Sequence, residues 1–156
     1  MAMSICSKEV GRGLAVLMAR IVDSDGVAIR PSDVSAIEYS VYELDPFWPE
    51  QLSVMRGHRA VRLDVGDVLF DSLQVGRCWG IDDVGYNFRH EIQLVQERPV
   101  SNAEYGYEVL YQLTLCNGRR TSVRFKLRSL HRETPSPALP ARGREFDRAL
   151  NIRRRL

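Results

Sequence analysis

The sequence predicts an all-β fold, an antiparallel sandwich of about seven strands, on the basis of three observations. Short segments with alternating apolar and polar residues recur along residues 13–130, as half-buried strands require. Turn signals separate these segments at residues 23–26, 65–67, 82–85 and 117–118. The segments between the turns show no convincing helical pattern.

Length and composition fit one domain followed by a tail. The chain has 156 residues, of which 44% are hydrophobic and 27% charged, and no apolar run reaches the roughly 20 residues that cross a bilayer. We expect an N-terminal arm over residues 1–12, the sandwich over 13–130 and a mostly disordered tail over 131–156. Seven arginines against three acidic residues give the tail a net charge of +4, whereas residues 1–130 have a net charge of −2.

Four segments of the body carry the clearest strand patterns. Residues 34–44, 60–65 and 85–94 alternate with a period of two. The last of these segments is expected to place one set of side chains on a single face: Tyr86, Phe88, His90, Ile92 and Leu94. Residues 14–22 are apolar on both faces, which fits a strand covered on both sides or a short helix. Their β-branched end and the following turn favour the strand.

Residues 105–129 are expected to form a hairpin around Asn117 and Gly118. A two-residue loop would set Tyr111 opposite the charged Arg124 on one face. A three-residue loop over 116–118, with Gly118 left-handed as a bulge, sets Tyr111 opposite Val123 instead. Because a slip of one residue moves every side chain to the other face, the need to bury apolar residues selects the three-residue turn.

Residues 79–90 and the hairpin that follows resemble known kinds of protein. Small uncharacterised bacterial proteins also pair a W-x-x-D-D-x-GYNF-type segment, here residues 79–88, with a closing hairpin that turns at a glycine. That resemblance implies the fold and no activity. The element order also resembles an immunoglobulin-like β-sandwich, in which Tyr105 or Tyr107 would be the corner tyrosine. The inter-sheet disulfide of antibody domains is missing, because residues 34–44 contain no cysteine.

Asp82, Asp83 and His90 are weak candidates for a metal or acid/base site. Two carboxylates and an imidazole could supply mixed oxygen and nitrogen ligands. Adjacent residues of an extended chain point to opposite faces, however, and His90 lies about 20 Å beyond Asp83 along a strand. We therefore expect Asp83 and Gly85 to form a turn and His90 to be a core or edge histidine with one hydrogen-bond partner.

Phe47 and Trp48 are the candidate partner-binding residues. They lie between Pro46 and Pro49, in a loop rather than a strand. One interpretation is that they cover an open end of the sandwich. The other is that they form an exposed aromatic anchor for a partner protein or a sugar ring.

The three cysteines of the chain predict a reduced, cytoplasmic protein. Cys6, Cys78 and Cys116 are an odd number, widely spaced, and form no C-x-x-C pair. We expect Cys78 to be a buried inert thiol, with a catalytic Cys/His pairing to His90 as the alternative. The sequence has no nucleophile elbow, phosphate-binding loop or dinucleotide motif, so we expect no cofactor and no enzymatic activity.

The arginine-rich tail could make electrostatic contacts through Arg153, Arg154 and Arg155. Nucleic acid, an anionic membrane surface and an acidic protein would all attract such a tail, and a merely solvated tail is the alternative. Without interleaved aromatic residues, any nucleic-acid binding is expected to be non-specific. Membrane insertion is not expected, and the sequence does not indicate an oligomeric state.

Taken together, these features predict a non-enzymatic protein-interaction or assembly module whose partner the sequence does not identify. Two alternatives remain at this point. One is a carbohydrate-binding sandwich that uses Trp48, Trp79 and nearby tyrosines. The other is a metal-dependent enzyme that uses Asp82, Asp83 and His90.

Overall fold

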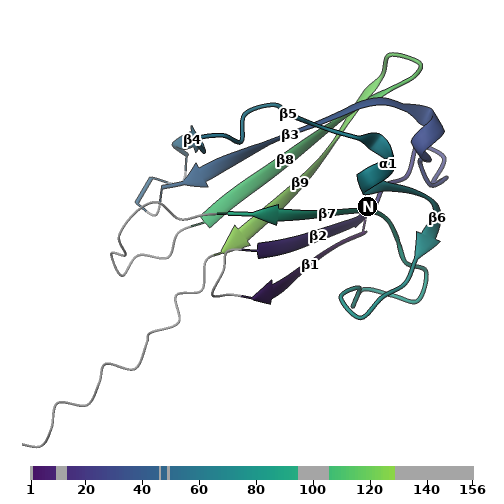
Figure 1. Cartoon of the computed structure of the whole chain (residues 1–156), viewed down its shortest axis with the longest axis horizontal. Coiled ribbons are helices and arrows are strands. Elements are labelled where there is room, and N and C mark those ends of the chain that lie inside the picture. Colours follow the sequence, from purple (N-terminus) through teal and green to yellow (C-terminus); the bar gives the residue numbers. More distant parts are fainter. Residues whose placement is uncertain (1, 10–13, 46, 49, 95–105, 129–156) are drawn as a thin grey trace, which may run out of the picture.

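Nine strands form two antiparallel sheets within the residues that the computed structural model describes, 2–9, 14–45, 47, 48, 50–94 and 106–128 (Figure 1). The strands are β1 (Ala2–Glu9), β2 (Leu14–Arg20), β3 (Val34–Leu44), β4 (Leu52–Val54), β5 (Val61–Leu63), β6 (Leu69–Gln74), β7 (Tyr86–Gln93), β8 (Gly106–Leu115) and β9 (Arg120–Arg128). One sheet has the order β1-β2-β7-β6, and the other has the order β4-β3-β8-β9 with β5 also paired to β3. The predicted all-β sandwich is confirmed, with more strands than the seven expected.

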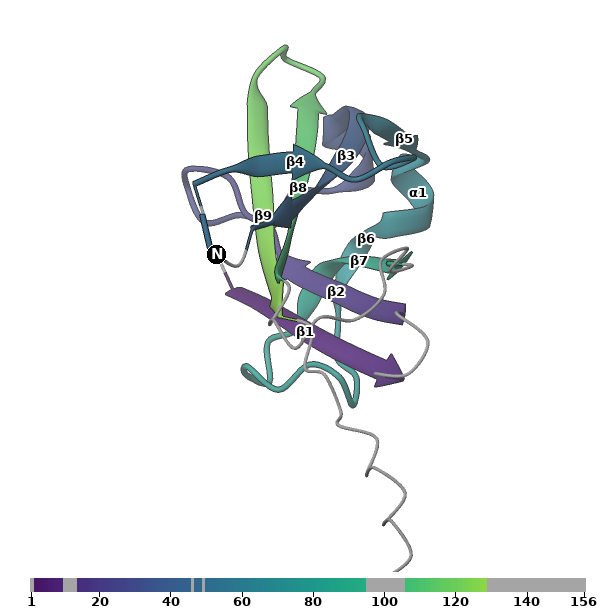
Figure 2. The same ribbon diagram turned by 90° about the vertical axis from the view of Figure 1, so that its left-hand side faces the viewer.

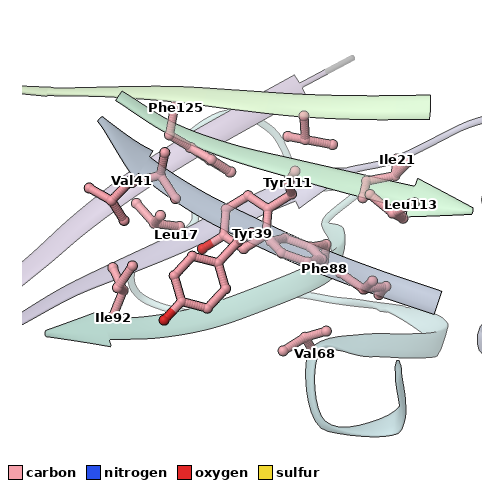
Figure 3. Packing of buried hydrophobic residues seen from close by; sticks show 14 of the residues in the cluster. Leu17, Ile21, Tyr39, Val41, Val68, Phe88, Ile92, Tyr111, Leu113 and Phe125 are labelled. Carbon is pink, nitrogen blue, oxygen red and sulfur yellow. The ribbon is translucent and has the colours of Figure 1, made fainter. Parts of the chain in front are cut away.

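The core lies between the two sheets and draws apolar side chains from both (Figure 3). Phe88 on β7 and Phe125 on β9 flank the fully buried ring of Tyr111 on β8. The ring centroid of Tyr111 lies 4.8 Å from that of Phe88 and 5.8 Å from that of Phe125, both in edge-on arrangements. Such aromatic contacts add stabilisation beyond the apolar area that they bury. This central aromatic group therefore joins β7 of one sheet to β8 and β9 of the other.

The β8–β9 hairpin has the predicted register. Tyr111 pairs with Val123, and the three-residue turn over 116–118 ends at Gly118, whose φ is +82°. The amide of Gly118 donates to the carbonyl oxygen of Leu115 at 2.9 Å, and the amide of Leu115 donates to the carbonyl oxygen of Arg119 at 2.8 Å. These two bonds are those of a type I turn followed by a glycine bulge.

The segment expected to be apolar on both faces is the strand β2, buried over Ala15–Ala19. Leu17 faces the core, while Val16 and Met18 form a second small cluster with Trp79 on the other face of the sheet. Trp79 belongs to the 75–85 loop, which connects β6 to β7. This loop explains why the sheet has a covered outer face.

Several elements differ from the sequence interpretation. β1 lies within the expected N-terminal arm and pairs with β2 in antiparallel register, as Figure 2 shows. The turn expected at residues 65–67 is a one-turn helix, α1 (Val65–Val68), which is capped by the Asp64 side chain. A short 3₁₀ turn, η1 (Pro31–Asp33), precedes β3. Tyr86 packs against the Trp79 cluster rather than the main core. The expected tail over 131–156 lies outside the described residues.

An arch over residues 55–60 interrupts the edge of the second sheet between β4 and β5. The amide of Val41 on β3 donates to the carbonyl oxygen of His58, and the amide of Met55 donates to the carbonyl oxygen of Val41. Met55 is buried in the core, and Ala60 has a positive φ of 46°. The arch thus replaces a continuous edge strand with a short folded segment that carries His58.

Candidate functional site

The Phe47–Trp48 loop, residues 45–51, presents two large aromatic side chains to solvent. Phe47 is 78% exposed and Trp48 is 67% exposed. Leu52, the first residue of β4, follows the loop and is also exposed. Side chains that covered an open end of the sandwich would be buried, so the covering interpretation does not hold for these two residues. The flanking Pro46 and Pro49 lie outside the described residues.

Asp45 fixes the backbone of this loop. Its Oδ1 accepts hydrogen bonds from the amide of Phe47 at 2.8 Å and from the amide of Trp48 at 3.0 Å. The amide of Gln51 then donates to the carbonyl oxygen of Trp48 at 2.8 Å. An aspartate that accepts from amides two and three residues ahead forms a local turn, and an Asp-Pro pair is a sequence signal for it. The two aromatic side chains therefore extend from a turn that is held by hydrogen bonds. This role of Asp45 was not predicted from the sequence.

Asp82 holds the 75–85 loop together. Its Oδ1 accepts from the amides of Val84 and Gly85 and from Trp79 Nε1, at 3.0 to 3.1 Å. The guanidinium of Arg20, at the end of β2, donates to both carboxylate oxygens and lies over the Trp79 ring. The Arg20 hydrogen bond, followed by that of Trp79, holds the pKa of Asp82 far below its usual value. Every one of these contacts is structural, and they tie the loop to the end of β2.

The structure does not bring Asp82, Asp83 and His90 together as a metal site. Asp83 is an exposed residue of the 75–85 loop. His90 lies on β7 opposite Leu17, with its Nδ1 at 2.8 Å from the hydroxyl of Tyr111. Among the described residues, no three histidine, cysteine or acidic side chains gather in the way that a metal ion requires. The expectation that His90 is a histidine with a hydrogen-bond partner is confirmed.

Two histidines and two tyrosines contact one another beside the arch: His58, His90, Tyr39 and Tyr111. Nδ1 of His58 lies 3.1 Å from the hydroxyl of Tyr39, whose ring also packs against those of His90 and Tyr111. Burial raises the pKa of Tyr39 and that of Tyr111. Burial is also the main cause that lowers the pKa of His90, with an opposing effect of Glu91 and a further lowering by His58. The His90–Tyr111 hydrogen bond joins β7 of one sheet to β8 of the other, and the His58–Tyr39 pair extends this partly buried polar group to the arch.

Asn87 is a second buried polar residue that the alternation of β7 did not reveal. Asn87 is 1% exposed, although the alternation that puts Phe88 on the core face would put its neighbour Asn87 on the opposite face. Oδ1 accepts from the amide of Ile21 at 2.7 Å, and Nδ2 donates to the carbonyl oxygens of Ile21 and Ile29 at 2.9 and 2.8 Å. Asn87 thereby fixes the segment that leads from β2 towards β3.

The cysteines differ from the expectation of free thiols. Cys78 is disulfide-bonded, so it is not the buried thiol that the sequence predicted. Cys116, in the hairpin turn, is free and exposed. Disulfides persist mainly in oxidising compartments, and the inference of a cytoplasmic location therefore loses the support that it drew from the cysteine count.

The comparisons add no relative to this description. Protein-family models, curated proteins and solved structures were compared with the chain, and nothing matches it. Over the described ranges, none of the helices has the length and apolar character needed to cross a membrane. Arg153, Arg154 and Arg155 lie outside those ranges. Of the predicted partner-contact residues, Phe47 and Trp48 are therefore the two that the structure describes.

Proposed function

We propose that this chain is a non-enzymatic interaction module that binds a partner protein through the Phe47–Trp48 loop. The observation that carries the proposal is the exposure of two large aromatic side chains on a turn held by Asp45. Exposed apolar groups of this size are enriched at protein interfaces, where buried aromatic side chains supply much of the affinity. Because the turn is already hydrogen-bonded, ordering it on binding costs little.

The expected contribution of each aromatic residue follows from its exposed area. Burying a Phe side chain fully is worth about 1.5–3 kcal/mol, and about 1.4 kcal/mol corresponds to a tenfold change in affinity. We expect each of F47A and W48A to weaken partner binding by about tenfold or more. Both side chains are exposed, so neither substitution should lower the stability of the sandwich.

The test is an affinity capture from the native host with the full chain as bait. A captured protein supports the proposal if F47A and W48A both abolish its retention while V27S retains it. Val27 is the matched control, because it is 59% exposed on a different loop. Titration calorimetry with the purified partner then measures the loss for each variant. Retention that is the same for all three variants would refute the role of the loop.

The same experiments would also detect two other binding functions. Of the two tryptophans in the carbohydrate-binding alternative, only Trp48 is exposed to a sugar, because Trp79 is buried and its indole nitrogen donates to Asp82. Glycan binding that W48A abolishes would therefore favour it. Binding through the tail would instead be lost in a variant with Ser at 153, 154 and 155, and would weaken steeply with salt.

A further inference from the structure

β9 is the most regular edge strand among those described. Nine consecutive residues, Arg120–Arg128, pair with the β8 residues from Thr114 back to Gly106, and no bulge interrupts these nine pairs. The other edges are interrupted: β1 and β6 each have a register shift, while β4 and β5 are three residues long and separated by the arch. Natural sheets blunt their edges because an open edge can pair with another strand. Among the described strands, none pairs with the outer side of β9, which ends its sheet as a regular edge.

The phase of the hairpin determines which main-chain groups of β9 face away from β8. The amide of Leu115 donates to the carbonyl oxygen of Arg119, and the pairing then alternates along the strands. Antiparallel partners exchange hydrogen bonds at every second pair. Thr121, Val123, Phe125 and Leu127 therefore bond to β8. The amides and carbonyls of Ser122, Arg124 and Lys126 point away from β8, to the side on which no other described strand pairs.

The same alternate residues give this edge a positive charge. Arg120, Arg124 and Lys126 are exposed on the outer face of the sheet, whereas Val123 and Phe125 are buried. Nε of Arg124 lies 3.2 Å from the carboxylate of Glu108 on β8, yet the arginine side chain remains 58% exposed. An added strand would thus meet a row of cations beside a row of free backbone groups.

Charge decides what can occupy the edge. Antiparallel pairing of two β9 strands from two copies would set arginines and lysines against each other, which opposes self-association. The tail of the chain, over 131–156, has a net charge of +4 and would be repelled as well. We propose that β9 binds an extended acidic segment of the partner protein, which adds to the sheet as a further strand. This inference rests on the proposed function and names the chemistry of the partner.

The two surfaces can contact one partner. Lys126 pairs with Glu108, and Glu108 pairs with Tyr42, so β9 ends at the same end of the sheet as the part of β3 from which the Phe47–Trp48 loop begins, with β8 between the two strands. Three strand spacings of about 4.8 Å separate β9 from β4, a span of about 15 Å. A partner with an aromatic-binding pocket and an acidic strand would cover both.

The test uses a synthetic ten-residue peptide that alternates glutamate with threonine and valine, and a matched peptide with lysine in place of glutamate. We expect the acidic peptide to bind the full chain, to bind more weakly at high salt, and to slow hydrogen exchange at the amides of Ser122, Arg124 and Lys126. The lysine peptide should not bind.

S122P is the decisive variant, because it removes an amide that points to the free edge and leaves the bonds to β8 intact. It should weaken acidic-peptide binding about tenfold relative to S122A, which keeps the amide. Should S122P fail to fold, R120E/K126E provides the second test and should abolish binding. Equal affinity of S122P and S122A for the acidic peptide would overturn strand addition. If the acidic peptide does not bind at all, the proposal is also wrong, and the cations of β9 only prevent other strands from pairing with it.

The outcomes for the two proposals are separable. Loss of partner capture in F47A and W48A, with retention in R120E/K126E, would leave the proposed function standing and refute the role of β9. Capture lost only in R120E/K126E would refute the Phe47–Trp48 loop and retain β9.

Discussion

Replacing Asn87 with alanine should destabilise the fold without changing any surface. The variant removes the hydrogen bonds to the amide and carbonyl of Ile21 and to the carbonyl of Ile29. The carbonyl oxygen of Ile21 still accepts from the amide of Ile29 at 3.0 Å, so two buried groups are left without a partner. At about 1–3 kcal/mol for each group, the free energy of unfolding should fall by about 2–6 kcal/mol. That is a large share of the stability of a small domain.

Urea unfolding followed by circular dichroism measures this loss, with Q93A as the control on the same strand because Gln93 is exposed. N87D adds a test of the mechanism. Its carboxylate would lie among carbonyl oxygens, where burial raises the pKa of an acid, so N87D should be more stable at lower pH than at neutral pH. A loss below about 1 kcal/mol for N87A would refute the reasoning. It would mean that water or a movement of the backbone provides new hydrogen-bond partners for the amide of Ile21 and the carbonyl of Ile29.

Three further predictions concern other parts of the molecule. G85A should cost several times more than G118A in urea unfolding: both glycines have a positive φ, worth about 1–2 kcal/mol, but a Cβ at Gly85 would also overlap the carbonyl of Gln74. Because the lowered pKa of His90 makes the folded state bind its proton less readily, stability should be full above pH 6.5 and fall below it, and H90Q should reduce that fall. A thiol titration of the denatured chain without reductant should find one free thiol, that of Cys116, whereas three would contradict the disulfide at Cys78.

The sequence predicted features that depend on neighbouring residues. The register of the hairpin follows from burial, because only the three-residue turn sets Tyr111 and Val109 against apolar partners. The sequence also predicted that residues 15–19 are buried on both faces of the sheet, but it did not predict that the 75–85 loop covers the outer face. The Phe47–Trp48 loop could be located from its prolines, but its exposure could not.

Features that depend on distant residues could not be predicted. Asp82 bonds to Arg20, 62 positions away, and no local pattern indicates that pairing. Asn87 falls on the polar side of an alternating strand, and only the path of residues 21–29 makes that position buried. The arch could not be predicted either. It forms hydrogen bonds to the amide and carbonyl of Val41 on β3, and a continuous edge strand would have bonded to the same two groups.

The contrast between the two tryptophans gives the chain a pair of optical probes. Indole emission moves to shorter wavelengths in apolar surroundings and to longer ones in water. Trp79 is buried beside Tyr86, so its emission should move to the red when the sandwich unfolds. Trp48 already faces water, so unfolding should leave its emission nearly unchanged, and docking of a partner should move it to the blue. W48F and W79F would separate the two signals, and unfolding and complex formation could then be followed in the same unlabelled protein.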